Sequence, residues 1–165
     1  MASFRYFALP FVATTLALAH HGTSSAEPAT GTVWLNRQMA ALAERNGADG
    51  WQVTSSGLRW RRIAGDGSGA RPGPADVVTV HYVGSLADGR EFDSSLKRGT
   101  PTSFPLNRVI PGWQEGVALM GVGDKVELAI PARLAYGSDG KGPIPGAATL
   151  LFTVELLGIE SSPGN

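Results

Sequence analysis

The clearest alternation of apolar and polar residues runs through the stretch DVVTVHYVGSL at positions 76–86. In an extended chain Val78, Val80 and Tyr82 fall on one side, and Thr79 and His81 fall on the other. A period of two residues is typical of a strand with one buried face. This segment is therefore predicted to be a β-strand that presents one apolar face to a core.

Other segments have the same period of two: the short run LRWRRI and the runs DKVELAIP and TLLFTVELLGIE. We expect their inward-facing residues to be Leu58, Trp60, Val126, Leu128, Ile130, Leu150, Phe152, Val154 and Leu156. An Asp-Gly pair at Asp88-Gly89 follows the first strand and indicates a tight turn. Short strands joined by turns in this way predict an antiparallel sheet.

A helical period appears near the N-terminus, over 32–46. Leu35, Met39 and Leu42 recur at i, i+4 and i+7, so we expect them to form the apolar contact face of a helix. Thr32 is the expected N-cap and Gly47 the expected stop signal. A single amphipathic helix is not stable alone. It is expected to dock on the following domain, and dimerisation through the same face is the alternative.

A second, shorter helix is predicted at 113–119, after Pro111 and Gly112. It is the one candidate to cover the apolar face of the sheet. The sequence thus predicts an α+β fold: an antiparallel β-sheet of about five strands curled around one short α-helix, preceded by an N-terminal helix. The content of 22 Gly and 11 Pro agrees with many turns and few long helices.

The N-terminal segment has the pattern of an export signal. Arg5 precedes an apolar stretch at 7–19, which is shorter than the about 20 residues that span a bilayer. Small-residue cleavage patterns end at Ala19 and Ala26. We expect a secretory signal peptide and export to the periplasm or the cell exterior, with an uncleaved anchor as the alternative. The predicted organisation is a signal peptide at 1–26, a helical arm at 27–56, one domain at 57–160 and a tail at 161–165.

Composition removes several function classes. The chain has no cysteine, so a disulfide framework, a thiolate nucleophile and a Cys metal site are excluded. Its formal net charge is +0, which gives no support for a nucleic-acid partner. The Gly-rich run at 65–74 ends in prolines and opens no helix, so it does not predict a phosphate site. We expect no metal and no cofactor, and we expect Asp124 and Lys125 to be solvated turn residues.

The residues expected between the sheet and the short helix are nearly all aromatic or aliphatic. One carboxylate and two phenols supply the polarity. This composition describes an apolar pocket with a few convergent polar groups. The candidates are Tyr82, Phe92, Asp93, Phe104, Val109, Ile110, Trp113, Tyr136, Ile144 and Phe152.

Four motifs occur in order: VTVHYVGSLADGREFDSS, VIPGWQEGV, LAIPARLAYG and ATLLFTVELL. Together they closely resemble the FKBP-type peptidyl-prolyl cis-trans isomerases over about 57–159, and the preceding helix with TSSGLRW resembles the lead-in of bacterial exported members. The resemblance implies a sheet wrapped around a short helix, with a pocket that takes a proline ring of a polypeptide. It also makes macrolide inhibitors candidate ligands.

The resemblance assigns roles within this set. It implies catalytic roles for Asp93, Tyr136, Phe92 and Tyr82, and substrate-binding roles for Trp113, Val109, Ile110, Phe104, Ile144 and Phe152. Three positions depart from the family pattern. Thr102 stands where a second aromatic residue is frequent, Lys141 where an apolar residue or His is frequent, and Arg62 where an aliphatic residue is usual. The first two bear on substrate preference and macrolide affinity.

These residues suit a reaction that makes and breaks no covalent bond. A peptide bond resists rotation with a barrier of about 18–20 kcal/mol, and before proline both isomers are accessible. A dry pocket that favours the twisted amide lowers this barrier by differential binding. We expect Trp113 to lie exposed at the floor of a water-poor cleft and Tyr136 to donate to a substrate carbonyl. Asp93 is expected to act electrostatically or to hold Tyr82 in place.

Other interpretations of the same residues are open. The aromatic residues could be ordinary core, and Asp93 could cap a turn. The chain could be a binding module or chaperone that keeps the fold with little turnover. A hydrolase that uses Glu91 and Asp93 is a third class, disfavoured because no further acid, base or metal group accompanies them.

Overall fold

The computed structural model describes residues 31–161. The predicted signal peptide, both cleavage patterns and residues 162–165 of the predicted tail lie outside the described residues, so the domain boundaries stay predictions. The elements are α1 (Thr32–Ala43), η1 (Ala48–Gly50), β1 (Gln52–Val53), β2 (Arg59–Ala64), β3 (Val77–Leu86), β4 (Glu91–Ser94), α2 (Ser95–Arg98), β5 (Thr102–Pro105), η2 (Leu106–Arg108), α3 (Pro111–Ala118), β6 (Lys125–Ile130), η3 (Ala132–Leu134) and β7 (Leu150–Glu160). None of the helices in this part of the chain is long and apolar enough to cross a membrane.

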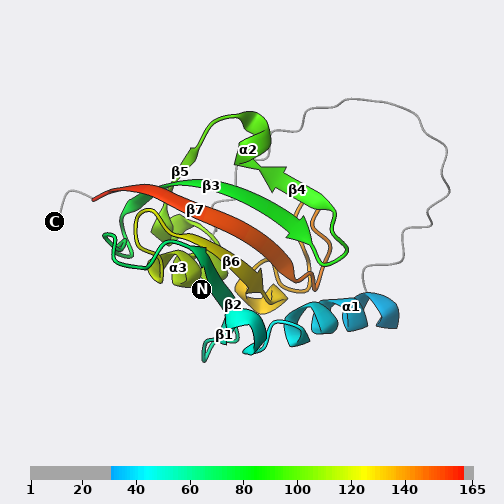
Figure 1. Cartoon of the computed structure of the whole chain (residues 1–165). Coiled ribbons are helices and arrows are strands. Elements are labelled where there is room, and N and C mark those ends of the chain that lie inside the picture. Colours follow the sequence, from blue (N-terminus) through cyan, green and yellow to red (C-terminus); the bar gives the residue numbers. More distant parts are fainter. Residues whose placement is uncertain (1–30, 162–165) are drawn as a thin grey trace, which may run out of the picture.

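Within the described residues, seven strands form one antiparallel sheet (Figure 1). The order is β1-β2-β6-β7-β3-β4, and β5 pairs with the first half of β3, beyond the end of β4. The two longest strands, β3 and β7, lie side by side from the pair Val77–Glu160 to the pair Leu86–Leu150. The predicted α+β fold is confirmed, and the short strands bring the number from about five to seven.

The inner face of the sheet is the apolar face that the sequence predicted. Along β3 every second residue is buried, including Val78, Val80 and Tyr82. Helix α3 packs against this face, with Trp113 and Val117 buried one helical turn apart (Figure 1). It begins at Pro111, slightly before the predicted start, because the fixed φ of proline suits the first helical position.

Helix α1 docks through a different face from the one predicted. Leu35 and Met39, expected at the contact, are 41% and 61% exposed, and the buried residues are Trp34, Gln38 and Ala41. The predicted N-cap, Thr32, is the first helical residue, and Gly31 occupies the cap position without a side-chain cap. Docking on the domain is therefore confirmed, whereas the contact face was wrong. Dimerisation through the face that stays open remains a prediction.

Hydrogen bonds explain the orientation of α1. The indole Nε1 of Trp34 donates to the carbonyl of Gly146 at 3.1 Å. The Oε1 of Gln38 accepts from the backbone N–H of Thr149 at 2.9 Å, and the hydroxyl of Thr149 donates to the carbonyl of Gln38 at 3.2 Å. The amide of Gln38 decides the contact face because the backbone N–H and the hydroxyl of Thr149 are buried polar groups that need hydrogen bonds.

Asp124 is not the solvated turn residue that the sequence predicted. It is 2% exposed, and its carboxylate accepts hydrogen bonds from the backbone N–H groups of Gly67 and Gly121 at 2.9 and 2.8 Å. The Nε of Arg62 donates to the same carboxylate at 3.1 Å, and the guanidinium of Arg62 also lies over the ring of Trp60. Arg62, which departs from the family pattern, thus supplies the charge that a buried carboxylate requires.

Candidate functional site

The centre of the candidate site is a cluster of aromatic rings around Trp113. Helix α3 brings this indole against the inner face of the sheet, where it meets the rings of Tyr82, Phe104 and Phe152. The ring centroids lie 5.3, 5.8 and 5.4 Å from the indole, and all three contacts are edge-to-face. This geometry is the one that aromatic quadrupoles favour.

The indole of Trp113 is more deeply buried than predicted. It is 0% exposed, so the expectation that it lies exposed at the floor of a cleft was wrong. The three ring edges that pack on it account for this burial. Its Nε1–H has no hydrogen-bond partner among the residues that the structure describes.

Phe92 and Tyr136 form the accessible margin of the cluster. Both are half-buried and pack against the core. The ring of Phe92 meets Phe152 edge-on at 5.6 Å. Gly84 on β3 makes this contact possible, because a Cβ at that position would lie 2.7 Å from the ring of Phe152 and 2.8 Å from that of Phe92.

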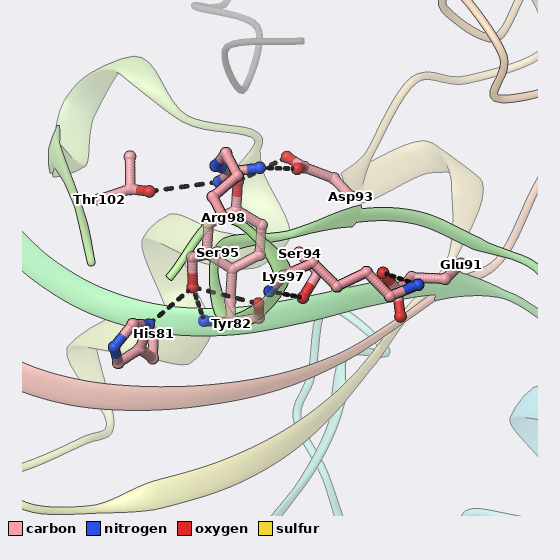
Figure 2. A network of polar contacts seen from close by, with 9 residues as sticks. All are labelled: His81, Tyr82, Glu91, Asp93, Ser94, Ser95, Lys97, Arg98 and Thr102. Carbon is pink, nitrogen blue, oxygen red and sulfur yellow. Dashed lines mark hydrogen bonds and ion pairs between the residues drawn. The ribbon is translucent and has the colours of Figure 1, made fainter. Parts of the chain in front are cut away.

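A polar cluster extends from the hydroxyl of Tyr82, and Figure 2 shows its residues. The hydroxyl of Tyr82 donates to Oδ2 of Asp93 at 2.5 Å. Arg98 forms an ion pair with the other carboxylate oxygen, and its Nη2 donates to the Tyr82 hydroxyl at 2.9 Å and to the Thr102 hydroxyl at 3.3 Å. Asp93 is therefore paired and oriented, a requirement for a carboxylate whose side chain is 7% exposed.

The turn from β4 into α2 sets the position of Asp93. Ser94 caps α2 by accepting from the N–H of Lys97 at 3.2 Å. The hydroxyl of the fully buried Ser95 accepts from the N–H of Tyr82 at 2.8 Å and lies 3.0 Å from Nδ1 of His81 (Figure 2). The turn is capped by Ser94, so Asp93 is free to pair with Arg98 and Tyr82 instead of serving as the cap.

Both phenols at the site hold their protons strongly. Burial, and after it the hydrogen bond to Asp93, raises the pKa of Tyr82. Burial, and after it the carboxylate of Asp93, raises the pKa of Tyr136. Each phenol is thus a hydrogen-bond donor at neutral pH.

Tyr136 differs from Tyr82 in how its hydroxyl is used. The hydroxyl of Tyr136 makes no hydrogen bond to any residue in the 31–161 range, so it is available to a ligand. The loop beyond it folds back through two hydrogen bonds between Lys141 and Ile144, of 2.8 and 2.9 Å. This places the ammonium of Lys141 5.8 Å from the centroid of the Tyr136 ring.

The ten residues predicted for the pocket lie in one region. Seven belong to a single buried cluster, Phe92 and Tyr136 pack against it, and Asp93 is tied to it through Tyr82. Val109 and Ile110 are buried where the chain enters α3, at 2% exposure each. The structure therefore brings the predicted residues together, and their roles stay predictions.

Comparison with known proteins identifies the family. A sequence model described as FKBP-type peptidyl-prolyl cis-trans isomerase matches residues 69–157. The chain belongs to this family. The family predicted from the four motifs is confirmed.

Individual members of the FKBP family are similar over most of the chain. The isomerase FkpA of Aeromonas hydrophila is 52% identical over 122 residues, which cover 74% of this chain and 44% of that protein. The 22 kDa FKBP-type isomerase of Escherichia coli is 52% identical over 119 residues, covering 72% of this chain and 57% of that protein. The chain spans about half the length of the curated relatives it matches. The crystal structure of FkpA from Escherichia coli superposes with a TM-score of 0.75 at 41% identity, covering 78% of this chain and 60% of that one.

Arg98 is the site residue that sequence reasoning missed. It lies five residues after Asp93, at the end of α2, and joins Asp93, Tyr82 and Thr102. A signal was present, because a carboxylate next to an FKBP pocket needs a cation and the SSLKR run supplies one. Thr102, singled out only as a departure from the family, accepts a hydrogen bond from the same arginine.

Proposed function

We propose that this chain is a peptidyl-prolyl cis-trans isomerase that acts on X-Pro bonds of polypeptides by binding the proline in an apolar pocket, without covalent chemistry. The observation that carries the proposal is that the site holds one oriented carboxylate and two phenols with different tasks. Tyr82 and Arg98 hold Asp93 in place, while the protonated hydroxyl of Tyr136 is available to a substrate carbonyl.

The burial of Trp113 changes how the substrate is expected to enter. We infer that the prolyl ring enters at the half-buried Phe92 and Tyr136, which form the margin of the cluster. Trp113 then supports the rings of Tyr82, Phe104 and Phe152 from below. Val109, Ile110 and Ile144 complete the apolar lining.

The reaction requires stabilisation of the twisted amide relative to the planar one. The planar amide is the more charge-separated form, so removal from water raises its free energy more than that of the twisted form. The carboxylate of Asp93 acts electrostatically on the twisting bond, and the Tyr136 hydroxyl fixes the carbonyl. Neither group forms a covalent bond to the substrate.

The wider role is assistance to exported proteins that fold slowly because of X-Pro isomerisation. Support for export comes from Arg5 and the apolar stretch at 7–19, which favour the periplasm or the cell exterior. Clients are proline-containing polypeptides. Macrolide inhibitors are candidate ligands, and their affinity depends on Thr102 and Lys141, two positions that depart from the family pattern.

A second candidate function is a binding module or chaperone with little turnover. Thr102 favours it, because this position accepts a hydrogen bond from Arg98 and adds no ring to the pocket wall. Rates of cis-trans exchange in a proline-containing peptide separate the two. The wild type should accelerate exchange, Asp93→Ala and Phe92→Ala should lose most of the acceleration, and Leu157→Ala, an exposed position on β7, should keep it. A wild-type rate equal to that of buffer would reject the enzyme and leave the binding module.

A further inference from the structure

Two arginines meet at the turn that precedes β2. The Nη1 of Arg59 donates to the carbonyl of Gly57 at 2.6 Å, and the Nη2 of Arg133, in η3, donates to the carbonyl of Ser56 at 2.5 Å. Gly57 has φ +83°, which favours glycine. A Cβ at this glycine would collide with Nη2 of Arg133 and lie 3.7 Å from Nη1 of Arg59, so both guanidinium groups face the same point.

The charges of these two arginines are not neutralised by the described residues. Neither forms an ion pair with any carboxylate between residues 31 and 161. Glu115, the carboxylate tied to the same turn, accepts a 2.6 Å hydrogen bond from the hydroxyl of Ser56. The buried Nε of Arg59 has no partner within that same range. Burial and the neighbouring charge of Arg133 lower the pKa of Arg59.

We propose that Arg59 and Arg133 form a binding site for an oxyanion, either the carboxylate of an acidic polypeptide or a phosphate group. Guanidinium groups bind such anions through parallel N–H donors. The carbonyl of Gly57 accepts a hydrogen bond from one guanidinium nitrogen of Arg59, and the carbonyl of Ser56 accepts one from Arg133. These bonds order the remaining N–H donors of both guanidinium groups before an anion binds. Arg133 is exposed, and an anion reaches it from solvent.

An open depression on the outer face of the sheet provides a contrast. It has a volume of about 360 Å³ and includes Trp51, Arg61 and Glu127 in its lining. Arg61 lies 2.5 Å from Glu127 and stacks over Trp51 at 5.1 Å. Because that arginine already has its counter-ion, the depression offers no comparable unmatched charge. The Arg59–Arg133 site differs from this depression because its two guanidinium groups converge on one point and neither has a counter-ion among the described residues.

Titration with inorganic phosphate, against chloride at matched ionic strength, tests the site. Amide chemical shifts of Gly57 and Arg59 in the full chain are expected to saturate with phosphate. Arg133→Gln should weaken this binding by about tenfold, and Arg133→Glu should abolish it, since the new carboxylate pairs with Arg59. Arg71→Gln, at an exposed loop arginine, is the matched control and should bind as the wild type does. The proposal would be overturned if the wild type showed saturable shifts neither with phosphate nor with a proline peptide that carries Asp and Glu. It would also be overturned if Arg133→Gln bound phosphate with unchanged affinity.

A pair of proline peptides distinguishes the two sources of the anion. One carries Asp and Glu beside the proline, and the other carries Asn and Gln at the same positions. Tighter binding of the acidic peptide, lost in Arg133→Glu, assigns the site to polypeptide carboxylates, whereas saturation by phosphate alone assigns it to free oxyanions. Either result supports the site. Turnover of the neutral peptide is expected to be equal in wild type and Arg133→Glu, so a failure of the anion site leaves the isomerase proposal intact.

Discussion

The phenol of Tyr82 donates a 2.5 Å hydrogen bond to Oδ2 of Asp93 on the adjacent strand. Tyr82 is 1% exposed, so the bond lies away from bulk water. Hydrogen bonds to ionised groups are roughly twice as strong as neutral ones, and a low local dielectric strengthens them further. The bond therefore fixes the carboxylate beside the aromatic cluster, where the proposed catalysis needs it.

Replacement of the two phenols separates support of the carboxylate from contact with substrate. Tyr82→Phe should lower the free energy of unfolding by about 1–2 kcal/mol, because Asp93 loses a buried donor. It should also lower kcat/KM in the proline-peptide assay by about tenfold, since the carboxylate is less well oriented. Urea unfolding and the exchange assay measure the two effects.

Tyr136→Phe is the matched control for that experiment. Its hydroxyl has no hydrogen-bond partner in the described part of the chain, so the free energy of unfolding should change by less than about 0.5 kcal/mol. Activity should still fall, because the donor to the substrate carbonyl is lost. Full activity in Tyr136→Phe would remove that role from the mechanism.

The same phenols predict a loss of stability at alkaline pH. The pKa values of Tyr82 and Tyr136 are raised in the folded protein, chiefly by burial. An unfolded chain releases its phenol protons near pH 10, while the folded chain still holds them, so the stabilisation is complete below about pH 10 and is lost as the pH rises further. The difference in free energy of unfolding between wild type and the Tyr82→Phe/Tyr136→Phe double variant should shrink above that pH. A difference that stays constant from pH 8 to 11 would contradict the raised pKa values.

The strands and the short helix were predictable because their signals are local. The alternation of Val78, Val80 and Tyr82, and the proline at the start of α3, follow from a few neighbouring residues. The family motifs likewise fixed which residues gather around Trp113. The motifs do not show how tightly these side chains pack. The indole of Trp113 was therefore expected to be exposed, whereas three rings cover it.

The wrong predictions for α1 and Asp124 have a different cause: both features depend on residues that are distant in the sequence. The contact face of α1 is set by Gly146 and Thr149, 111 or more residues away. Asp124 is buried because Gly67 and Arg62, 57 and 62 residues earlier, supply its donors. Sequence periodicity contains no information on such pairs, and hydrogen bonds to them override the hydrophobic pattern.

Asp124 should be important for stability even though it lies outside the candidate site. Asp124→Asn is expected to lower the free energy of unfolding by about 2–4 kcal/mol, since Arg62 loses its counter-ion and buried N–H groups lose an ionised acceptor. Asp139→Asn, an exposed loop position, is the control and should stay within about 0.5 kcal/mol of wild type. Thermal or urea unfolding at pH 7 makes the comparison.

Acid adds a second measurement for Asp124. Burial acts to raise the pKa of this carboxyl, but the hydrogen bonds from Gly121, Gly67 and Arg62 outweigh it and hold the pKa below the ordinary value. The stabilisation is therefore present above about pH 4 and is lost as the pH falls through the folded value. The difference in free energy of unfolding between wild type and Asp124→Asn should become smaller in acid. Equal stability of Asp124→Asn and Asp139→Asn at pH 7 would show that the network contributes nothing.

Paired variants of α1 decide which of its faces holds the helix to the domain. Gln38→Ala removes the acceptor of the buried Thr149 N–H and should lower the free energy of unfolding by about 1–3 kcal/mol. Met39→Ala, at the adjacent exposed position, should change it by less than about 0.5 kcal/mol, measured by urea unfolding at equal protein concentration. The reverse order, with a loss for Met39→Ala that shrinks as the protein is diluted, would mean that the open face is covered by a second copy. In that case the Leu35 and Met39 face, and not the Trp34 and Gln38 face, would carry most of the stability that α1 adds.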